Sequence, residues 1–377
     1  MKILLLCTHE TTYVLQLYRY MKKYYPNIKY SLFTKESAKP YYQRHLELQK
    51  GESIYTFGAH DYLCCVEAKK LPHFDIIHSL WMEQFWGEAA HILRRKCDAW
   101  FCSVGGSDLY RQSNKLFFRI LQKRIISRAD WISSEGEETK EYFEKVYKMK
   151  GRKTPHTIVR FGVDILDCFD EIHDIEVGNL KKKYDIPSGK IVVMCGTNGR
   201  KEHQHMKMLE AIEKLPEAIL NNCCLLFPMT YGGNEDYIRS VQDRALSITK
   251  NSVVLREFLT TAEMAEVASI TDIMIHVQTT DQLSSAMLSH MYHGNVVIAG
   301  SWLPYHTLRE KGIMFISVNR IDEITEQLME VVPNIEEWKR QCSFNAEIVY
   351  HMSSWENSAR EWYYVYNQLT EKNEGRI

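Results

Sequence analysis

The loop from Gly196 to His203 carries the residue types best suited to hold a phosphate group. It follows the apolar run 191–195 and precedes a helical pattern. A glycine-bearing turn at the start of a helix offers backbone N–H groups and a positive dipole end to an anion. Arg200 and Lys201 add positive charge beside Gly199. The alternative is that these charges simply lie exposed on a turn.

Two polar residues follow predicted strands in the first third of the chain. His9 stands in the loop after the apolar run Lys2–Cys7, and Asp108 stands in the glycine-rich turn 105–109. Ligands of parallel sheets bind where strands end, so both residues are candidate catalytic groups. A lone histidine is about as often structural, and Asp108 fits a cap of the next helix equally well.

A basic helix is expected between Leu109 and Ala129. Lys115, Arg119 and Lys123 recur at a spacing of four residues, among many apolar side chains. Such a helix suits docking to an anionic bilayer, where each basic residue contributes about 1 kcal/mol. An ordinary packed helix with a solvated charged face is the alternative.

Short apolar runs alternate with helical patterns along the chain, which is typical of a doubly wound parallel sheet. The expected strands of a first series are Lys2–Cys7, Ile76–Leu80, Trp100–Val104, Trp131–Ser133 and Thr157–Arg160. Those of a second series are Ile191–Cys195, Cys224–Pro228, Val253–Leu255, Ile273–Val277, Asn295–Ala299 and Met314–Ser317.

The chain of 377 residues is long enough for two domains at about 150 residues each. The two series predict a first domain over residues 1–166 and a second over 167–350. The charged stretch 167–190 between them is expected to contain the linker. Residues 351–377 include an aromatic-rich helical run, 353–369, which is expected to return to the first domain.

The composition narrows the compartment and the partners. A net charge of -1 gives no global field that would favour nucleic acid. The ten cysteines form no C-x-x-C pair and several lie in apolar runs, so we expect reduced, buried thiols in the cytoplasm.

Several motifs of the first series resemble the GT-B glycosyltransferases, and among them the large retaining family 4 that builds bacterial glycans and lipopolysaccharides. Residues 129–139, ADWISSEGEET, look like the family's A-D-x-I-x-x-S-E motif, and Arg160–Asp164 is similar to P-N-G-V-D. The turn containing Asp108 looks like the H-G-x-D segment that faces the acceptor, although Gly105 replaces the histidine. The resemblance implies two Rossmann-like domains facing a cleft.

The strongest resemblance is that of residues 279–299 to the donor-binding signature E-G-F-G-L-P-x-x-E-A-M-A-x-G-x-P-V-V-A. It places Asp281 on the first glutamate, which contacts the transferred sugar, and Ser289 on the second, which holds the ribose. Ser284 and Ser285, at the predicted helix start, are expected to meet the diphosphate or to cap the helix. His203 falls on the family lysine, which leaves the charge to the preceding loop.

Two further strand-end loops are expected to line the donor pocket. The first, 227–234, contains Thr230, Tyr231 and Gly232, and a similar P-M-x-Y-G run occurs in bacterial transferases that use deoxyamino sugars. The second contains Glu257 and Leu259 in a passage whose backbone brackets the nucleobase in the resembling family.

The resemblance implies a hexosyltransferase-type enzyme that uses a nucleotide-diphospho-sugar and a glycan or lipid-linked acceptor in bacterial surface polysaccharide synthesis, with retention of configuration. No cofactor or metal is expected, because N–H groups and basic side chains can stabilise the leaving diphosphate. A nucleotide-sugar epimerase, an inverting transferase and a catalytically silent partner subunit remain alternatives, the last because of Gly105, His203 and Ser289.

Overall fold

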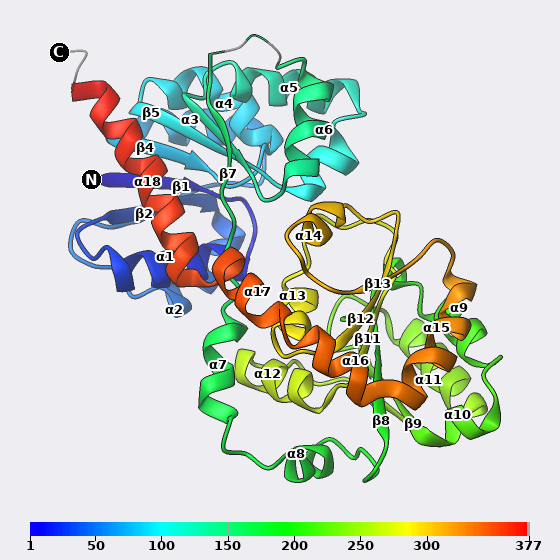
Figure 1. Ribbon diagram of the computed structural model, residues 1–377. Helices are drawn as coiled ribbons and strands as arrows, with labels where there is room; N and C mark the ends of the chain where they lie inside the picture. Colours follow the sequence, from blue (N-terminus) through cyan, green and yellow to red (C-terminus); the bar gives the residue numbers. More distant parts are fainter. Residues whose placement is uncertain (150, 152, 375–377) are drawn as a thin grey trace. The chain divides into compact units, whose positions relative to one another are not determined.

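The chain divides into two compact units in the computed structural model, which describes residues 1–149, 151 and 153–374. The first unit comprises Met1–Gly162 together with the chain from Trp355 onward, and the second is Val163–Ser354 (Figure 1). The second unit is therefore inserted into the first. None of the described helices is long and apolar enough to cross a membrane.

The first unit is built on a parallel sheet that has seven strands within the described residues, in the order β3-β2-β1-β4-β5-β6-β7 (Figure 1). The strands are β1 (Lys2–Leu6), β2 (Lys29–Lys35), β3 (Ile54–Phe57), β4 (Phe74–Ser79), β5 (Cys97–Val104), β6 (Trp131–Ser134) and β7 (His156–Ile158). The helices are α1 (Thr12–Tyr24), η1 (Glu36–Ala38), α2 (Lys39–His45), α3 (Asp61–Lys70), α4 (Gln84–Arg94), η2 (Ser107–Gln112), α5 (Leu116–Ile126), α6 (Glu137–Tyr147) and α18 (Trp355–Glu374).

Helices cover both faces of this sheet. Side chains of α3, α4, α5 and α6 share one buried cluster with alternate residues of β1, including Leu4 and Leu6. The opposite face, with Ile3 and Leu5, packs against α1, α2 and α18. Because successive residues of a strand point to opposite faces, a strand buried on both sides must be continuously apolar, as β1 is.

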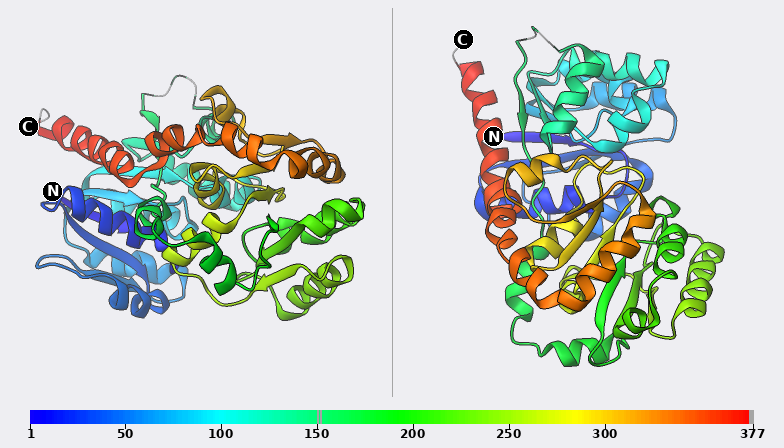
Figure 2. Two further views of the ribbon diagram at one scale, coloured as in Figure 1. Left: turned by 60° about the horizontal axis from the view of Figure 1, so that its bottom comes forward. Right: turned by 45° about the vertical axis from the view of Figure 1, so that its right-hand side comes forward.

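The helix α18 runs beside α1 on the sheet of the first unit, as both views of Figure 2 show. Its aromatic residues supply the contact. Trp362 and Tyr366 are fully buried, and Tyr20 stacks on Trp355 with ring centroids 4.7 Å apart. The indole N–H of Trp362 donates to the carbonyl of Arg160 at 2.9 Å.

The second unit repeats the same winding. Within the described residues its parallel sheet has six strands in the order β10-β9-β8-β11-β12-β13. These are β8 (Ile191–Cys195), β9 (Cys223–Pro228), β10 (Ser252–Leu255), β11 (Ile273–His276), β12 (Val296–Gly300) and β13 (Ile316–Val318). Numbered from the first strand of each unit, both sheets begin 3-2-1-4-5-6, the Rossmann order, whose crevice lies between strands 1 and 4.

The helices of the second unit are α7 (Ile165–Ile172), α8 (Val177–Lys183), η3 (Lys201–His203), α9 (His205–Ile212), α10 (Glu217–Asn222), α11 (Glu235–Ile248), α12 (Thr261–Ile270), α13 (Ser285–Tyr292), α14 (His306–Glu310), η4 (Ile321–Glu323), α15 (Ile324–Val331), η5 (Val332–Asn334), α16 (Ile335–Cys342) and α17 (Asn345–Ser353). One sheet face packs against α7, α8, α12, α13 and α17, and the other against α9, α11 and α15.

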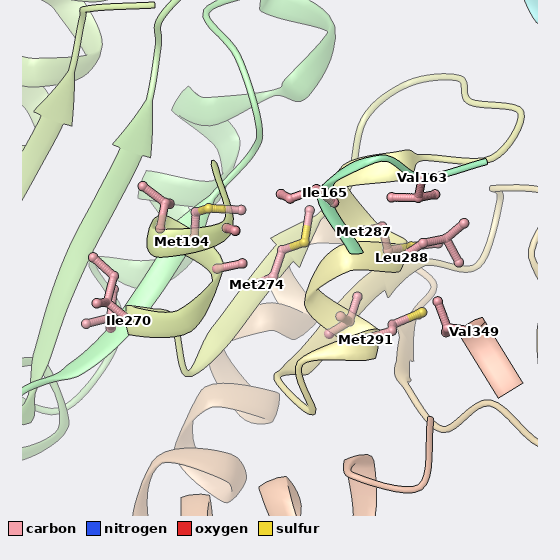
Figure 3. Close-up of a cluster of buried hydrophobic side chains, with 14 of the residues drawn as sticks. Val163, Ile165, Met194, Ile270, Met274, Met287, Leu288, Met291 and Val349 are labelled. Carbon is pink, nitrogen blue, oxygen red and sulfur yellow. The ribbon is translucent and has the colours of Figure 1, made fainter. Parts of the chain in front are cut away.

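Methionines fill much of the first of these two interfaces. Met194 and Met274 from the sheet lie near Met287 and Met291 of α13 (Figure 3). All four are buried. Thioether side chains adapt to irregular gaps, which suits them to this interface between α13 and the sheet.

Three expectations about elements differ from the structure. Residues 167–190 are not a linker, because α7 and α8 form there and pack into the core of the second unit; the units divide at Gly162 rather than 166. The basic helix is broken into the π-helical turn η2 and α5, and Lys115 precedes α5 as its N-cap residue. The strands β2 and β3 were not predicted.

Candidate functional site

The loops after β8 and β11 lie side by side at the crevice of the second sheet. The N–H of Gly196 donates to the carbonyl of Ile275 at 3.1 Å, and the side-chain amide of Gln204 donates to the carbonyl of Val277 at 2.6 Å. A third bond joins the N–H of Thr279 to the carbonyl of Glu202 at 2.9 Å. The predicted phosphate loop therefore stands next to the loop that carries Asp281.

The loops after β8 and β9 touch through glycines. The Cα of Gly233 lies 3.1 Å from where a Cβ on Gly199 would stand, so neither position has room for a side chain. The N–H of Gly199 donates to the carbonyl of Tyr231 at 2.8 Å. Gly232 adopts φ +80°, and the stem of Arg200 lies against it, with Cγ 2.6 Å from an added Cβ. These glycines bring the Arg200 side chain against the β9 loop.

The positive charge at this crevice comes from Arg200 and Lys201, both of which are exposed. His203, at the position of the family lysine, is buried and its Nε2 lies 3.4 Å from the hydroxyl of Thr197. Burial lowers the pKa of His203 to about 3, so the imidazole is neutral at physiological pH. It can position the loop but cannot supply a cation.

Asp281 is the centre of a buried polar network. Its Oδ2 accepts from the hydroxyl of Tyr305 and lies 3.1 Å from Nε2 of His276, and its Oδ1 accepts from the N–H of Gln282 at 2.8 Å. His276 and Tyr305 are buried, whereas 16% of the Asp281 side chain remains exposed. Neither His276 nor Tyr305 was predicted as a site residue from the sequence.

The network holds Asp281 as an anion. Burial alone would raise the pKa of this carboxyl group, but the hydrogen bonds and charge of His276 and the hydroxyl of Tyr305 outweigh it, so the pKa is lowered. The pKa of Tyr305 lies well above its ordinary value because burial and the nearby carboxylate oppose its ionisation. Tyr305 therefore stays a donor at neutral pH.

The three serines of the α13 segment occupy different environments. Ser284 caps α13, its hydroxyl accepting from the N–H of Met287 at 3.2 Å, and Ser285 is exposed in the first turn. Ser289 is 1% exposed, and its hydroxyl donates to the carbonyl of Ala286 at 2.8 Å. The buried position of Ser289 speaks against a direct contact with ribose in this conformation.

The β9 and β10 loops present aromatic rings. Tyr231 is 49% exposed and Phe258 is 72% exposed, and their ring centroids lie 6.4 Å apart. Thr230 is half-buried, Glu257 is exposed, and Leu259 packs against the core of the unit. Tyr231 also lies beside the β8 loop, with its hydroxyl 3.4 Å from the amide nitrogen of Asn198.

In the first unit, His9 and Glu83 pair at the corresponding crevice, between β1 and β4. Nδ1 of His9 lies 3.2 Å from Oε1 of Glu83, and the His9 side chain is 54% exposed. Glu83 also accepts from the N–H of Thr8 at 3.1 Å. The ring of Trp81 lies 5.1 Å from that of His9. A carboxylate that orients an exposed imidazole is an arrangement suited to proton transfer.

Gly105 and Asp108 lie against the loop after β4, Gly105 beside Trp81 and Asp108 beside Met82. A side chain at position 105 would collide with the Trp81 indole, so a histidine there would require the indole to move. Asp108 is 2% exposed, and its Oδ2 accepts from the N–H of Met82 at 2.7 Å. Burial raises the pKa of Asp108 to about 7. Asp108 thus holds the loop after β4. It does not cap η2, because the N-cap residue of η2 is Gly106, which makes no side-chain hydrogen bond.

The structure thus gathers Gly199, Arg200, Lys201, Asp281, Ser284 and Ser285 at the loops after β8 and β11, with Thr230, Tyr231 and Gly232 beside them. His9 and Asp108 belong to the first unit. Sequence reasoning missed Glu83, Trp81, His276 and Tyr305. A histidine ending an apolar strand and a glutamate just past a strand end were the available signals.

Solved structures share this architecture over nearly the whole chain. Sucrose-phosphate synthase from Thermosynechococcus elongatus covers 99% of this chain and 100% of its own, with a TM-score of 0.77 and 14% identity. HepE from Anabaena, solved with UDP and glucose, covers 98% and 100%, with a TM-score of 0.72 and 13% identity. A glycosyltransferase from Rickettsia africae covers 98% of each chain, with a TM-score of 0.74 and 13% identity.

The chain has the GT-B fold. This confirms the fold class expected from the sequence. No protein-family model matches the chain, and no curated protein matches it in sequence. The GT-B likeness at this level of identity shows the architecture, and the retaining family and the role of each site residue stay predictions. Within the described residues, no group of three or more His, Cys, Asp or Glu side chains could hold a metal ion.

Proposed function

We propose that the protein is a glycosyltransferase that moves a sugar from a nucleoside-diphosphate sugar to an acceptor. One observation carries the proposal: the Arg200 and Lys201 loop and the loop from Asp281 to Ser284 are hydrogen-bonded neighbours at the crevice of the second sheet. Doubly wound sheets bind nucleotides at this place. The solved complexes of HepE with UDP and with UDP-glucose support the same class of donor.

In this proposal the residues divide the work. Arg200, Lys201 and the start of α13 hold the diphosphate and stabilise the charge that develops as it leaves. Asp281, fixed as an anion by its buried partners, accepts hydrogen bonds from hydroxyl groups of the transferred sugar. The reaction needs no metal ion, because Arg200, Lys201 and the start of α13 supply the positive charge.

The acceptor in this proposal is a glycan or a lipid-linked sugar of a bacterial surface polysaccharide, and the donor carries a hexose or a deoxy or amino sugar. Transfer proceeds with retention of configuration. The motif resemblance and the PMTYG run at 228–232 support this narrower assignment. A lipid-linked acceptor places the enzyme in the cytoplasm, at the inner face of the membrane.

A second candidate, an inverting transferase, is favoured by one specific observation. His9 is exposed and its Nδ1 faces the Glu83 carboxylate at 3.2 Å, which leaves Nε2 available to accept a proton from an acceptor hydroxyl. Inversion by direct displacement needs such a base. The anomeric configuration of the product distinguishes the two candidates.

The test begins with thermal unfolding of the wild-type protein in the presence of nucleotides and nucleotide sugars. A ligand that prefers the folded protein raises its melting temperature by mass action, which identifies the donor. Replacing Arg200 and Lys201 together by alanine should then weaken nucleoside-diphosphate binding by about 1–3 kcal/mol in calorimetry. The matched control is Lys207→Ala with Lys214→Ala, which removes the same charge from two exposed positions, one in the first turn of α9 and one just after its last residue.

Equal affinity for the nucleotide in the Arg200 and Lys201 variant would refute the assignment of the phosphate site. Binding of a nucleotide sugar without transfer to any acceptor, but with release of an isomerised sugar, would favour an epimerase. Binding with neither reaction would favour a silent partner subunit.

A further inference from the structure

The helix α5 of the first unit exposes large apolar side chains in its first half. Leu116 is 75% exposed, Phe117 is 56% exposed and Ile120 is 47% exposed. Position 120 is a neighbour of both 116 and 117 on the helix surface, because it follows them by four and three residues, so the three form one patch. Of the other apolar residues of α5, Leu121, Ile125 and Ile126 are buried and Phe118 is half-buried. The exposed patch is therefore not part of the packing of the unit.

Basic side chains flank this apolar patch at both ends. Lys115 precedes it, and Lys123 and Arg124 follow it, all three exposed. Residues 109–129 contain six Lys or Arg and no Asp or Glu, whereas the whole chain has a net charge of -1. The positive charge of this segment is thus concentrated locally rather than reflecting the composition.

Arg119 does not belong to the exposed surface. Its Nη2 donates to the carbonyl of Val146 at 2.7 Å, which ties α5 to the end of α6. This differs from the expectation that Lys115, Arg119 and Lys123 form one basic stripe. Arg119 lies in the wall of a hollow between the two helices, together with Leu116, Ile120, Lys123 and Lys148. Basic and apolar side chains therefore line this hollow together.

We propose that the exposed face of α5 docks on a bilayer that contains anionic lipids. Leu116, Phe117 and Ile120 insert at the boundary between headgroups and acyl chains, and Lys115, Lys123 and Arg124 contact the headgroup phosphates. A second copy of the chain fits this surface poorly. A twofold dimer through the same patch would bring two basic segments together, and like charges repel.

The binding has two components that can be removed separately. The charges attract the surface over a distance set by salt, and the apolar side chains add affinity once they are buried. Neither component spans the bilayer, so the contact is reversible. Loss of three cationic contacts should lower the partition coefficient at least about tenfold.

The experiment is co-sedimentation of the full chain with vesicles at low salt, followed through a salt titration. Vesicles of phosphatidylcholine alone are compared with an equimolar mixture of phosphatidylcholine and phosphatidylglycerol. One variant carries Lys115→Gln, Lys123→Gln and Arg124→Gln. A second carries Leu116→Ser, Phe117→Ser and Ile120→Ser. The matched controls in the second unit are Lys207→Gln, Lys214→Gln and Lys250→Gln for charge, and Phe344→Ser, whose residue is 77% exposed, for the apolar change.

We expect the wild-type protein to sediment with the anionic vesicles and to be released by salt. Both α5 variants should lose at least about tenfold in binding while keeping the wild-type melting temperature, because the residues are exposed, and the controls should bind like wild type. Absence of wild-type binding, or an equal loss in the controls, would overturn the proposal. So would a wild-type dimer, seen by light scattering, that the Leu116, Phe117 and Ile120 variant dissociates without any change in vesicle binding.

Discussion

Asp281 shows what a single residue gains from its surroundings. A carboxylate in the loop after β11 was predicted from motif register, yet its electrostatic state depends on His276 and Tyr305, which come from a strand end and from the loop after β12. Nε2 of His276 is 3.0 Å from the Tyr305 hydroxyl, so the three groups form one cluster. Such a cluster orients the carboxylate and leaves part of it exposed for a ligand.

Replacing Asp281 by asparagine should keep nucleotide affinity and lower kcat/KM by roughly 10- to 100-fold, which corresponds to about 1.4–2.8 kcal/mol. The charge that orients the sugar is lost, while the diphosphate contacts remain. Steady-state transfer and nucleotide titration on the same variant measure the two effects. Near-wild-type turnover would contradict a role in sugar binding.

Tyr305→Phe is the companion variant, because it removes one hydrogen bond to Asp281 and keeps the carboxylate. It should reduce kcat/KM by less than the asparagine substitution and leave nucleotide affinity unchanged. A melting temperature measured for both variants separates this effect from loss of folded protein, since each change leaves a buried polar group with fewer partners.

At this scale the sequence identifies residue types more reliably than their accessibility. Arg200 and Lys201 stand exposed at a strand end, where their loop position had placed them. Two different motifs predict site roles for Ser289 and Asp108, but both residues are buried. Register along a helix or turn does not reveal which neighbours cover a side chain; Met82, which bonds Asp108, is 26 residues away in sequence.

Most of the strands and helices that hold the site residues could be predicted from the apolar pattern of the sequence. Doubly buried strands such as β1 and β12 are continuously apolar, and this marks them without any tertiary information. β2 and β3 have polar residues among their apolar ones, namely Lys29, Ser31, Thr34 and Thr56. Neither strand is therefore a continuous apolar run, and neither was predicted. The charged residues from Asp167 onward predict a linker, whereas the structure has the helix α7 there, with Leu166 and Phe169 buried.

The last helix, α18, is expected to contribute strongly to the stability of the first unit. Trp362→Ala should destabilise this unit by about 3–5 kcal/mol, because the indole is fully buried against His78 and Phe101 and donates to the Arg160 carbonyl. Urea unfolding monitored by circular dichroism measures the loss.

Tyr364 provides the control, since its side chain on the same helix is 58% exposed. Tyr364→Ala should change stability by no more than about 0.5 kcal/mol. An unfolding midpoint of Trp362→Ala equal to that of wild type would mean that α18 is not needed to hold the first sheet together.

The whole molecule repeats one winding pattern in two units of different composition. Each crevice carries its own polar set: a histidine–glutamate pair in the first and a cationic loop with a buried carboxylate network in the second. The GT-B architecture was therefore predictable from the βα alternation and the motifs. The pairing of His9 with Glu83 was not, because it depends on strand order rather than on sequence distance.

Buried histidines predict an acid-sensitive fold. Burial lowers the pKa of His78, His203 and His290 from 6.5 to about 3 and that of His205 to about 4. At a pH between these folded-state pKa values and 6.5, the histidines of the unfolded chain bind protons that the buried histidines do not. The folded protein therefore has its full stability above pH 6.5 and loses stability as the pH falls below that value. Asp108 has the opposite effect on stability, since its pKa is raised to about 7, but it is a single group against these four histidines and His156, whose pKa burial also lowers to about 3.

The melting temperature should accordingly be lower at about pH 5 than at about pH 7.5. His290→Gln should reduce this difference, because it removes one of the buried imidazoles, whereas His351→Gln should not, because His351 is 70% exposed. A melting temperature that is equal at the two pH values, or that responds equally to both substitutions, would contradict the assignment.

The insertion of the second unit between β7 and α18 has a consequence for the order in which the chain can mature. The two ends of the inserted unit meet, with the N–H of Val163 donating to the carbonyl of Ser353 at 2.7 Å. During synthesis, all of its residues leave the ribosome before α18 does. Domains usually form from the N-terminus onward, but here the α1 face of the first sheet must wait for Trp355, Trp362 and Tyr366. The unit that starts first is thus completed last. Until α18 packs on it, the apolar α1 face of the first sheet is incompletely covered and offers a binding surface to a chaperone.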